Sequence, residues 1–208
     1  MKKLLITLLA ILLPALLGAA SGRLSADDFN PENPENPGAN YWDAFTGEMI
    51  LDDYNPEDIQ QTITKLLGSS SASQVLKLTI VGEFSLDAHY EFFRSMGENY
   101  PNLHELNLSQ TTGYQSLHNS YFKDNTSLQT IALPATVAMI GDMAFQGCSN
   151  LAEVRLYNRT PVAFGGNNVF TGTSDDLVIR VPQKAVASYE AASQWKDTPT
   201  LPPSSAKP

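Results

Sequence analysis

Short apolar triplets recur along the sequence at nearly constant spacing, and this repetition restricts the fold more than any other feature. The pattern L-x-x-L-x-L begins at Leu103 and returns at Leu128 and Leu151, and a matching triplet begins upstream at Val75. Its positions are Val75, Leu78 and Ile80; Leu103, Leu106 and Leu108; Leu128, Ile131 and Leu133; Leu151, Val154 and Leu156; and Ile179 and Val181. Repeats spaced in this way are typical of stacked, one-dimensional folds.

A second set of positions follows the same period. Phe122, Phe145 and Phe170 each lie six residues before the next unit begins, and Gly141 and Gly147 are matched in the following unit by Gly166 and Gly172. A unit as short as that from Leu103 to Leu128 cannot bury its own apolar side, so neighbouring units must stack. We therefore predict a right-handed superhelical solenoid of the α/β type. It would have a short parallel sheet of about five strands on its concave side and irregular return legs, with phenylalanines meeting leucines in the core.

Both ends of such a stack need a cap, because the terminal units would otherwise expose their core. At the amino end, Asn55 as N-cap and Pro56 at the first helical position predict a helix over residues 56–67. A second helix is expected over residues 85–96, in place of the first return leg. At the carboxyl end, the pattern predicts a last strand and then a short helix, with Tyr189 and Trp195, together with Val186, closing the core.

The amino-terminal residues have the order of a secretory signal peptide: two lysines, the apolar run LLITLLAILLPALL and the small residues GAASG. We expect cleavage after Ala20, with Gly22 as the alternative, and no lipid anchor, since no cysteine directly follows the apolar run. The expected organisation is a signal peptide over 1–20, an acidic linker rich in proline and asparagine over 21–40, and an N-terminal helical cap over 41–74. The repeats would occupy 75–182, a C-terminal capping helix 183–197 and a disordered tail 198–208.

The charge of the chain argues against two classes of partner, and its cysteine content excludes an internal disulfide. The chain carries 13 basic and 22 acidic residues, and the net charge of −9 becomes −11 once Lys2 and Lys3 are removed with the signal peptide. Residues 23–58 alone hold ten acidic residues and one basic residue, so nucleic acid and anionic membrane surfaces are poor partners. The single cysteine, Cys148, allows no internal disulfide.

The unit SLQTIALPATVAMIGDMAFQGCSNL resembles the BspA-like leucine-rich repeat family, whose units run L-x-x-I-x-L-P, I-G-x-x-A-F and G-C-x-x-L. The resemblance extends over residues 75–197 and is most specific at residues 128–151. It implies a leucine-rich repeat solenoid in a surface-associated or secreted bacterial protein without enzymatic activity. In this family some members bind host matrix proteins or other bacteria.

The strand positions that point away from the core form the candidate binding surface. Arg155, Tyr157 and Arg180 gather toward the carboxyl end of this concave face, and arginine and tyrosine are enriched at protein interfaces. The proposed ligand-binding residues are Glu105, Asn107, Glu153, Arg155, Tyr157 and Arg180. The alternative is an ordinary solvated sheet face.

Cys148 aligns with Asn125 and Thr173 at a turn, where small polar side chains can bond to the loop backbone. We assign structural roles to Asn125, Cys148, Phe122, Phe145 and Phe170. A catalytic thiol would need a nearby base, and the unit that contains Cys148 has no histidine.

His89, His104 and His118 are interpreted as surface or turn residues, because no cysteine or paired carboxylate stands at metal-ligand spacing. No G-x-S-x-G elbow occurs either. No metal, cofactor or enzymatic activity is therefore expected.

The leading hypothesis is a monomeric, exported and adhesin-like interaction module. It would bind a protein or glycan, for example one of the host extracellular matrix or of another bacterial surface, and it would be secreted, periplasmic or on the cell surface. The alternative is a structural or accessory subunit of a cell-envelope assembly.

Overall fold

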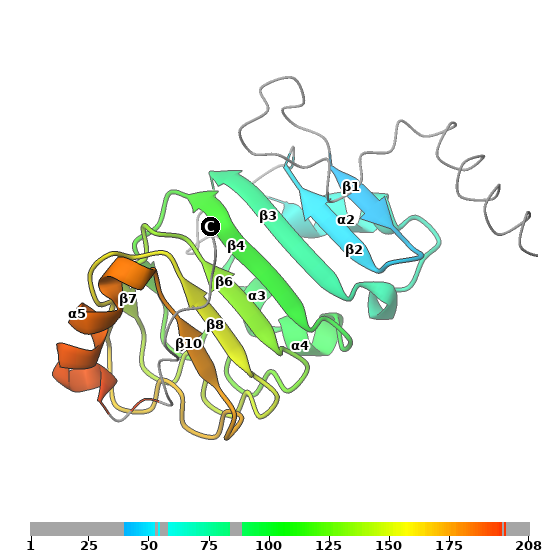
Figure 1. The fold of residues 1–208 in the computed structure, drawn as a ribbon. Helices are drawn as coiled ribbons and strands as arrows, with labels where there is room; N and C mark the ends of the chain where they lie inside the picture. Colours follow the sequence, from blue (N-terminus) through cyan, green and yellow to red (C-terminus); the bar gives the residue numbers. More distant parts are fainter. Residues whose placement is uncertain (1–39, 53, 55–57, 84–88, 197, 199–208) are drawn as a thin grey trace, which may run out of the picture. The chain divides into compact units, whose positions relative to one another are not determined.

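Figure 1 shows a computed structural model of the chain, which describes residues 40–52, 54, 58–83, 89–196 and 198. The signal peptide, most of the acidic linker and the tail expected from the sequence lie outside these residues, apart from Asn40 and Thr198. The statements below concern the described residues.

Seven strands form one open, mostly parallel sheet (Figure 1) in the order β1-β2-β3-β4-β6-β8-β10. Their bounds are β1 Tyr41–Asp43, β2 Glu48–Leu51, β3 Lys77–Glu83, β4 Glu105–Thr112, β6 Thr130–Leu133, β8 Glu153–Leu156 and β10 Val178–Arg180. Among these described strands, only β1 and β2 pair in antiparallel fashion. Within this sheet, β3, β4, β6, β8 and β10 each come from a different sequence repeat.

The register of this sheet follows the apolar repeat. Hydrogen-bonded pairing aligns one core position of every unit, in the row Leu78, Leu106, Ile131, Val154 and Ile179. All five side chains are buried. Side chains along a strand alternate between the two faces of the sheet. The residues directly before and after each of these core positions therefore point away from the core. The predicted strands and their alignment are therefore confirmed.

The sheet contains two strands more than the five expected. Strands β1 and β2 form a hairpin that extends the sheet on the amino side, within the range expected to be a helical cap. Gly47 has φ of +70°, and a Cβ at this position would lie 2.5 Å from Leu76 Cγ. Its carbonyl accepts hydrogen bonds from the amides of Leu76 at 2.7 Å and Lys77 at 3.0 Å, which fasten the turn to the start of β3.

The return legs are more regular than expected. They carry a second, three-stranded parallel sheet in the order β5-β7-β9, made of β5 Ser116–Leu117, β7 Met139–Ile140 and β9 Ala163–Phe164. Each of these strands has only two residues, too short for a strand pattern to be recognised in the sequence. In the first unit, helices α3 Tyr90–Arg94 and α4 Met96–Asn99 lie between β3 and β4. Residues 85–88 of the helix expected over 85–96 lie outside the described residues, and the described part is broken at Ser95.

The amino-side helix begins later than the sequence indicated. Helix α2 covers Ile59–Leu67, and its N-cap is Asp58, whose Oδ1 accepts a hydrogen bond from the Gln61 amide at 2.8 Å. The expected N-cap, Asn55, lies outside the described residues. Ile59 and Ile63 are buried in the core, and Leu66 and Leu67 pack against it partly buried, so one face of the helix is apolar. A short 3-10 helix, η2 Ala72–Gln74, leads from this segment toward β3.

Three short helices follow β10 at the carboxyl side: η3 Gln183–Ala185, α5 Val186–Ala191 and η4 Ser193–Trp195. Tyr189 and Trp195 are buried, as expected, whereas Val186 is only half-buried. The Trp195 indole N–H donates a hydrogen bond to the Val162 carbonyl at 2.9 Å, which ties η4 to the last return leg.

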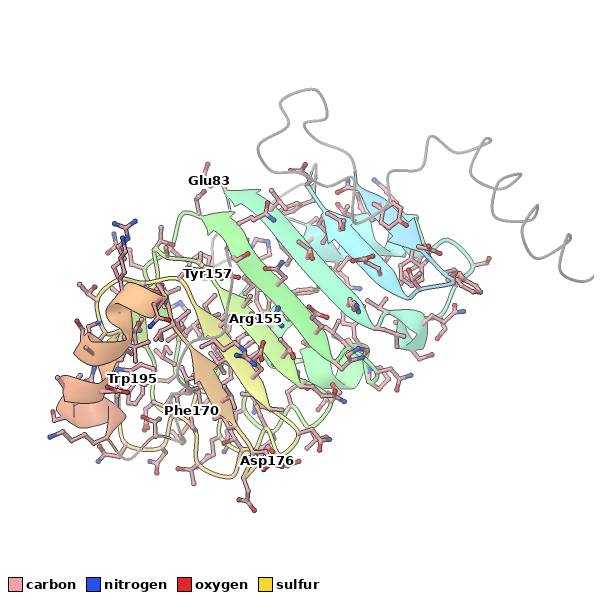
Figure 2. All side chains as sticks on the ribbon, viewed as in Figure 1. Glu83, Arg155, Tyr157, Phe170, Asp176 and Trp195 are labelled. Carbon is pink, nitrogen blue, oxygen red and sulfur yellow. The ribbon has the colours of Figure 1, made fainter. Side chains whose placement is uncertain are left out.

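The three phenylalanines of the repeat form a continuous stack, in which Phe122 and Phe145 are buried and Phe170 is half-buried. The ring centroids of Phe122 and Phe145 lie 5.4 Å apart with planes at 6°, and those of Phe145 and Phe170 lie 5.5 Å apart with planes at 2°. Trp195 lies beside the last ring of the stack, with its ring centroid 6.5 Å from that of Phe170 and the two planes tilted by 48° (Figure 2). Aromatic rings at these distances contribute packing energy beyond the area they bury. The phenylalanine column therefore joins successive repeats.

Candidate binding surface

The side of the main sheet that faces away from the core carries two rows of side chains, which we call the outer face. The first row contains Glu48, Lys77, Glu105, Thr130, Glu153 and Val178, and the second contains Ile50, Thr79, Asn107, Ala132, Arg155 and Arg180. Most of these side chains are half-buried or exposed, while their neighbours along each strand are buried. Ala132 and Ile50 are buried although they belong to an outward row.

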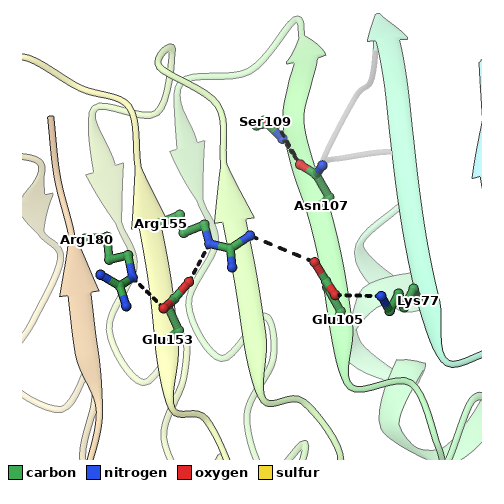
Figure 3. A network of polar contacts seen from close by, with 7 residues as sticks. All are labelled: Lys77, Glu105, Asn107, Ser109, Glu153, Arg155 and Arg180. Carbon is green, nitrogen blue, oxygen red and sulfur yellow. Dashed lines mark hydrogen bonds and ion pairs between the residues drawn. The ribbon is translucent and has the colours of Figure 1, made fainter. Parts of the chain in front are cut away.

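Five charged residues of the outer face form one network of alternating sign (Figure 3). Lys77 Nζ lies 3.6 Å from Glu105 Oε2, and Arg155 Nη1 lies 3.9 Å from Glu105 Oε1. The Nε atoms of Arg155 and Arg180 both donate to Glu153, one to each carboxylate oxygen. The network crosses five strands, from β3 to β10, and it joins residues of four different sequence repeats.

Small residues on β6 make the longest step of this network possible. Arg155 on β8 and Glu105 on β4 are separated by β6, which places Thr130 and Ala132 between them in the register. Because these two side chains are short, the arginine can extend over β6 and reach the glutamate. Ala132 is buried, which fits a position overhung by a longer neighbour.

The electrostatics of the network centre on Glu153, whose side chain is only 17% exposed. Burial by itself would raise the pKa of this carboxyl. The hydrogen bonds donated by Arg180 and Arg155, and the positive charges of both groups, outweigh burial and lower the pKa below its usual value. Glu153 therefore stays ionised and holds both arginines in defined positions.

The structure brings together four of the six proposed ligand-binding residues: Glu105, Glu153, Arg155 and Arg180. Asn107 bonds locally instead, since its Oδ1 accepts from the Ser109 amide at 3.0 Å and the Ser109 hydroxyl at 2.7 Å. Tyr157 follows the end of β8, and this residue is 47% exposed (Figure 2).

Lys77 is not among the ligand-binding residues proposed from the sequence. The repeat that aligns Leu78 with Leu106 also puts Lys77 directly beside Glu105, and the structure has this pair in register. Opposite charges at paired positions of neighbouring strands are the signal that could have found it.

Cys148 and Asn125, the turn residues assigned structural roles, form hydrogen bonds with backbone carbonyl and amide groups. Cys148 is fully buried, and its thiol donates to the Phe122 carbonyl of the preceding unit at 3.0 Å. Burial raises the pKa of this thiol to about 12. Asn125 Oδ1 accepts from the Ser127 and Leu128 amides, both at 3.2 Å, and from the Ser127 hydroxyl at 2.9 Å. Neither side chain is placed for nucleophilic chemistry.

One histidine differs from its interpretation as a surface or turn residue. His89 is buried at the N-terminal end of α3, whereas His104 and His118 are half-buried. Helix α3 begins directly after His89 and packs Phe92 and Phe93 into the core, so His89 lies at a covered position; this helix boundary was not legible in the sequence. Among the described residues, no group of three histidine, cysteine, aspartate or glutamate side chains is arranged to hold a metal ion.

None of the helices in the part of the chain described here combines the length and apolar composition needed to cross a membrane.

Leucine-type residues that recur once per strand, parallel strands in matched register and return legs joined by a phenylalanine stack define a leucine-rich repeat protein. The family model described as "BspA type Leucine rich repeat region" matches residues 96–188 in 6 copies. This region of the chain therefore belongs to the BspA-type leucine-rich repeat family. The match begins at Met96, after β3, so the first strand of the repeat pattern lies outside it. No curated protein matched the sequence.

Proposed function

We propose that this protein is a non-enzymatic interaction module that binds a protein partner through the outer face of its repeat sheet. The charged network of Figure 3 carries this proposal. Glu153 holds Arg155 and Arg180 by their Nε atoms, so their terminal nitrogens are directed by the fold before any partner arrives. Surface ion pairs of this kind add little stability, about 0–1 kcal/mol each, so folding alone gives a weak reason for the arrangement.

The partner that fits this surface carries carboxylates. Arg180 uses its Nε for Glu153, and no contact of its terminal nitrogens with another described residue is seen. A guanidinium fork held in this way can accept a carboxylate in a bidentate manner. The exposed ring of Tyr157 adds an aromatic contact of the type enriched at interface hot spots.

Binding of the purified protein to immobilised extracellular-matrix proteins tests this function. The triple variant Arg155→Ala/Tyr157→Ala/Arg180→Ala should lose at least about tenfold in affinity, as truncation of interface hot spots does. The matched control is Arg159→Ala/Lys184→Ala, which removes two exposed cations outside the outer face. Equal binding by the triple variant and the wild type, or an equal loss in the control, would contradict the proposal.

We further propose that the repeats stack as a short, capped solenoid over residues 75–182, with residues 41–74 and 183–197 as the caps. The burial of Ile63 on α2, and of Tyr189 and Trp195 at the other end, supports this organisation. Residues 1–20 would direct export, followed by an acidic linker over 21–40, and the mature protein would be secreted, periplasmic or on the cell surface. N-terminal sequencing of the exported protein should find Ser21; an uncleaved Met1 would contradict the signal peptide.

A second candidate, an accessory subunit of an envelope assembly, is favoured by Phe45. This side chain is 95% exposed at the tip of the β1–β2 hairpin, and the Asp43 carboxylate fixes the turn by accepting from the Phe45 amide at 2.8 Å. An exposed aromatic side chain on a turn that is held by a hydrogen bond suits a docking anchor. If the protein is such a subunit, Phe45→Ser should release it from its complex during co-purification, whereas the outer-face triple variant should not.

A further inference from the structure

A groove of about 760 Å³ lies on the return-leg side of the molecule, at its carboxyl end. One wall is formed by the last return leg, around β9 and the residues that follow it, and the other by η4. This groove is separate from the outer face, since none of the residues that line it belongs to the charged network.

The chemistry of the groove differs from that of the rest of the chain. The protein carries a net charge of −9, yet none of the described residues that line the groove is charged. Phe164 and Phe170 form its apolar part, with ring centroids 5.8 Å apart and planes at 74°. Both rings are half-buried, so each keeps some surface open to solvent.

Polar groups surround these rings. Asn167, Thr171 and Ser193 are exposed, and no hydrogen bond of their side chains to another described residue is seen. Gln194 donates its Nε2 to the Val162 carbonyl at 2.8 Å, which fixes the amide and leaves Oε1 available as an acceptor. Amide and hydroxyl groups therefore offer donors and acceptors within one concave site.

Two glycines, Gly165 and Gly166, lie in the wall of the groove. Gly166 has no room for a side chain, because a Cβ would lie 2.3 Å from Asp142 Cγ of the preceding unit. With Gly165 beside it, the wall consists of backbone alone at this point, so a ligand can approach the peptide groups closely.

We propose that this groove binds a neutral saccharide. Sugars present hydroxyl groups, which match uncharged amide and hydroxyl side chains, and apolar C–H faces, which match partly exposed aromatic rings. An ionic ligand would find no opposite charge among the described lining residues. The site adds a second binding surface to the proposed interaction module and does not depend on the outer face.

Isothermal titration calorimetry with a small panel of hexasaccharides tests this proposal. The probes are maltohexaose, cellohexaose, mannohexaose and N-acetylchitohexaose as neutral sugars, and hexagalacturonate as the charged one. At least one neutral probe should bind with a Kd of about 0.1–1 mM, a weak affinity suited to a small open site. Asn167→Ala/Thr171→Ala should weaken that binding roughly tenfold, as the loss of two ligand hydrogen bonds does.

Both substituted residues are exposed, and circular dichroism should show an unchanged fold. Arg155→Ala/Arg180→Ala should bind the same sugar as the wild type, which separates this site from the outer face. The proposal is overturned if no neutral probe binds at about 5 mM, well above that Kd. It is equally overturned if the groove variant binds unchanged, if the arginine variant loses the sugar, or if hexagalacturonate binds as tightly as the neutral probes.

Discussion

Replacement of Asn125 by alanine should destabilise the protein far more than the replacement of its neighbour. Asn125 is buried in the turn before β6, where its Oδ1 accepts three hydrogen bonds from Ser127 and Leu128. The Leu128 amide is buried, and a buried donor left without a partner costs about 1–3 kcal/mol. The Ser127 groups are half-buried and can turn to water, so their loss costs less, about 0.5–1 kcal/mol together.

The expected loss of unfolding free energy for Asn125→Ala is therefore about 1.5–4 kcal/mol. Urea denaturation followed by circular dichroism measures it, and at a slope of about 2 kcal/mol per molar the midpoint should fall by about 0.8–2 M. Thr126→Ala is the matched control, since its side chain is exposed and should change the free energy by less than about 0.5 kcal/mol. Equal midpoints for the two variants would refute the view that this side chain holds the turn together.

Three other outcomes are expected. The lowered pKa of Glu153 means that this carboxylate stabilises the fold above its unfolded pKa of about 4.3, and that this contribution disappears as pH falls through the lower folded pKa. The stability difference between wild type and Glu153→Gln should thus be present at pH 7 and shrink below about pH 4 in urea titrations; a difference that grew in acid would contradict it. Cys148, with its pKa raised to about 12, should react with a thiol reagent at pH 8 only after unfolding, so rapid labelling of the native protein would show that it is accessible. Phe145→Ala should cost about 3–5 kcal/mol in chemical denaturation, as the truncation of a buried aromatic ring does. Phe45→Ala should leave the free energy of unfolding nearly unchanged, because this ring is exposed, and similar losses for the two variants would disprove the stacking role of Phe145.

Sequence reasoning succeeded where a physical requirement recurs in every unit. The apolar row from Leu78 to Ile179 must be buried by stacking, so its period alone determines which strands pair and in which register. It failed where an element occurs once. Met49 and Leu51 pair with Leu78 and Ile80 and share their spacing, but the antiparallel hairpin that brings them there has no counterpart in the repeat.

In the candidate site, too, the sequence predicted some features and not others. The alternation of strand side chains placed Arg155 and Arg180 on the outer face without knowledge of the structure. Their shared contact with Glu153 could not be derived in the same way, because it depends on the side-chain conformations of two long residues. The step from Arg155 to Glu105 also requires small residues on the strand between them, a condition that concerns three repeats at once.

Asn125, Cys148 and Thr173 occupy the same turn position of successive repeats, and their contacts explain why the repeat need not keep one residue type there. Cys148 bonds to the carbonyl of Phe122 in the preceding unit, whereas Thr173 donates to the carbonyl of Phe170 in its own unit at 2.8 Å. Asn125 belongs to the second unit. In the first unit α4 takes the place of the phenylalanine turn, and a Cβ on Gly97 of that helix would lie 3.1 Å from the Asn125 side chain. With no such carbonyl to reach, Asn125 bonds to the amides of its own turn instead. The repeated requirement is a small polar group that bonds to a backbone atom of the turn, and three different side chains meet it in three different ways.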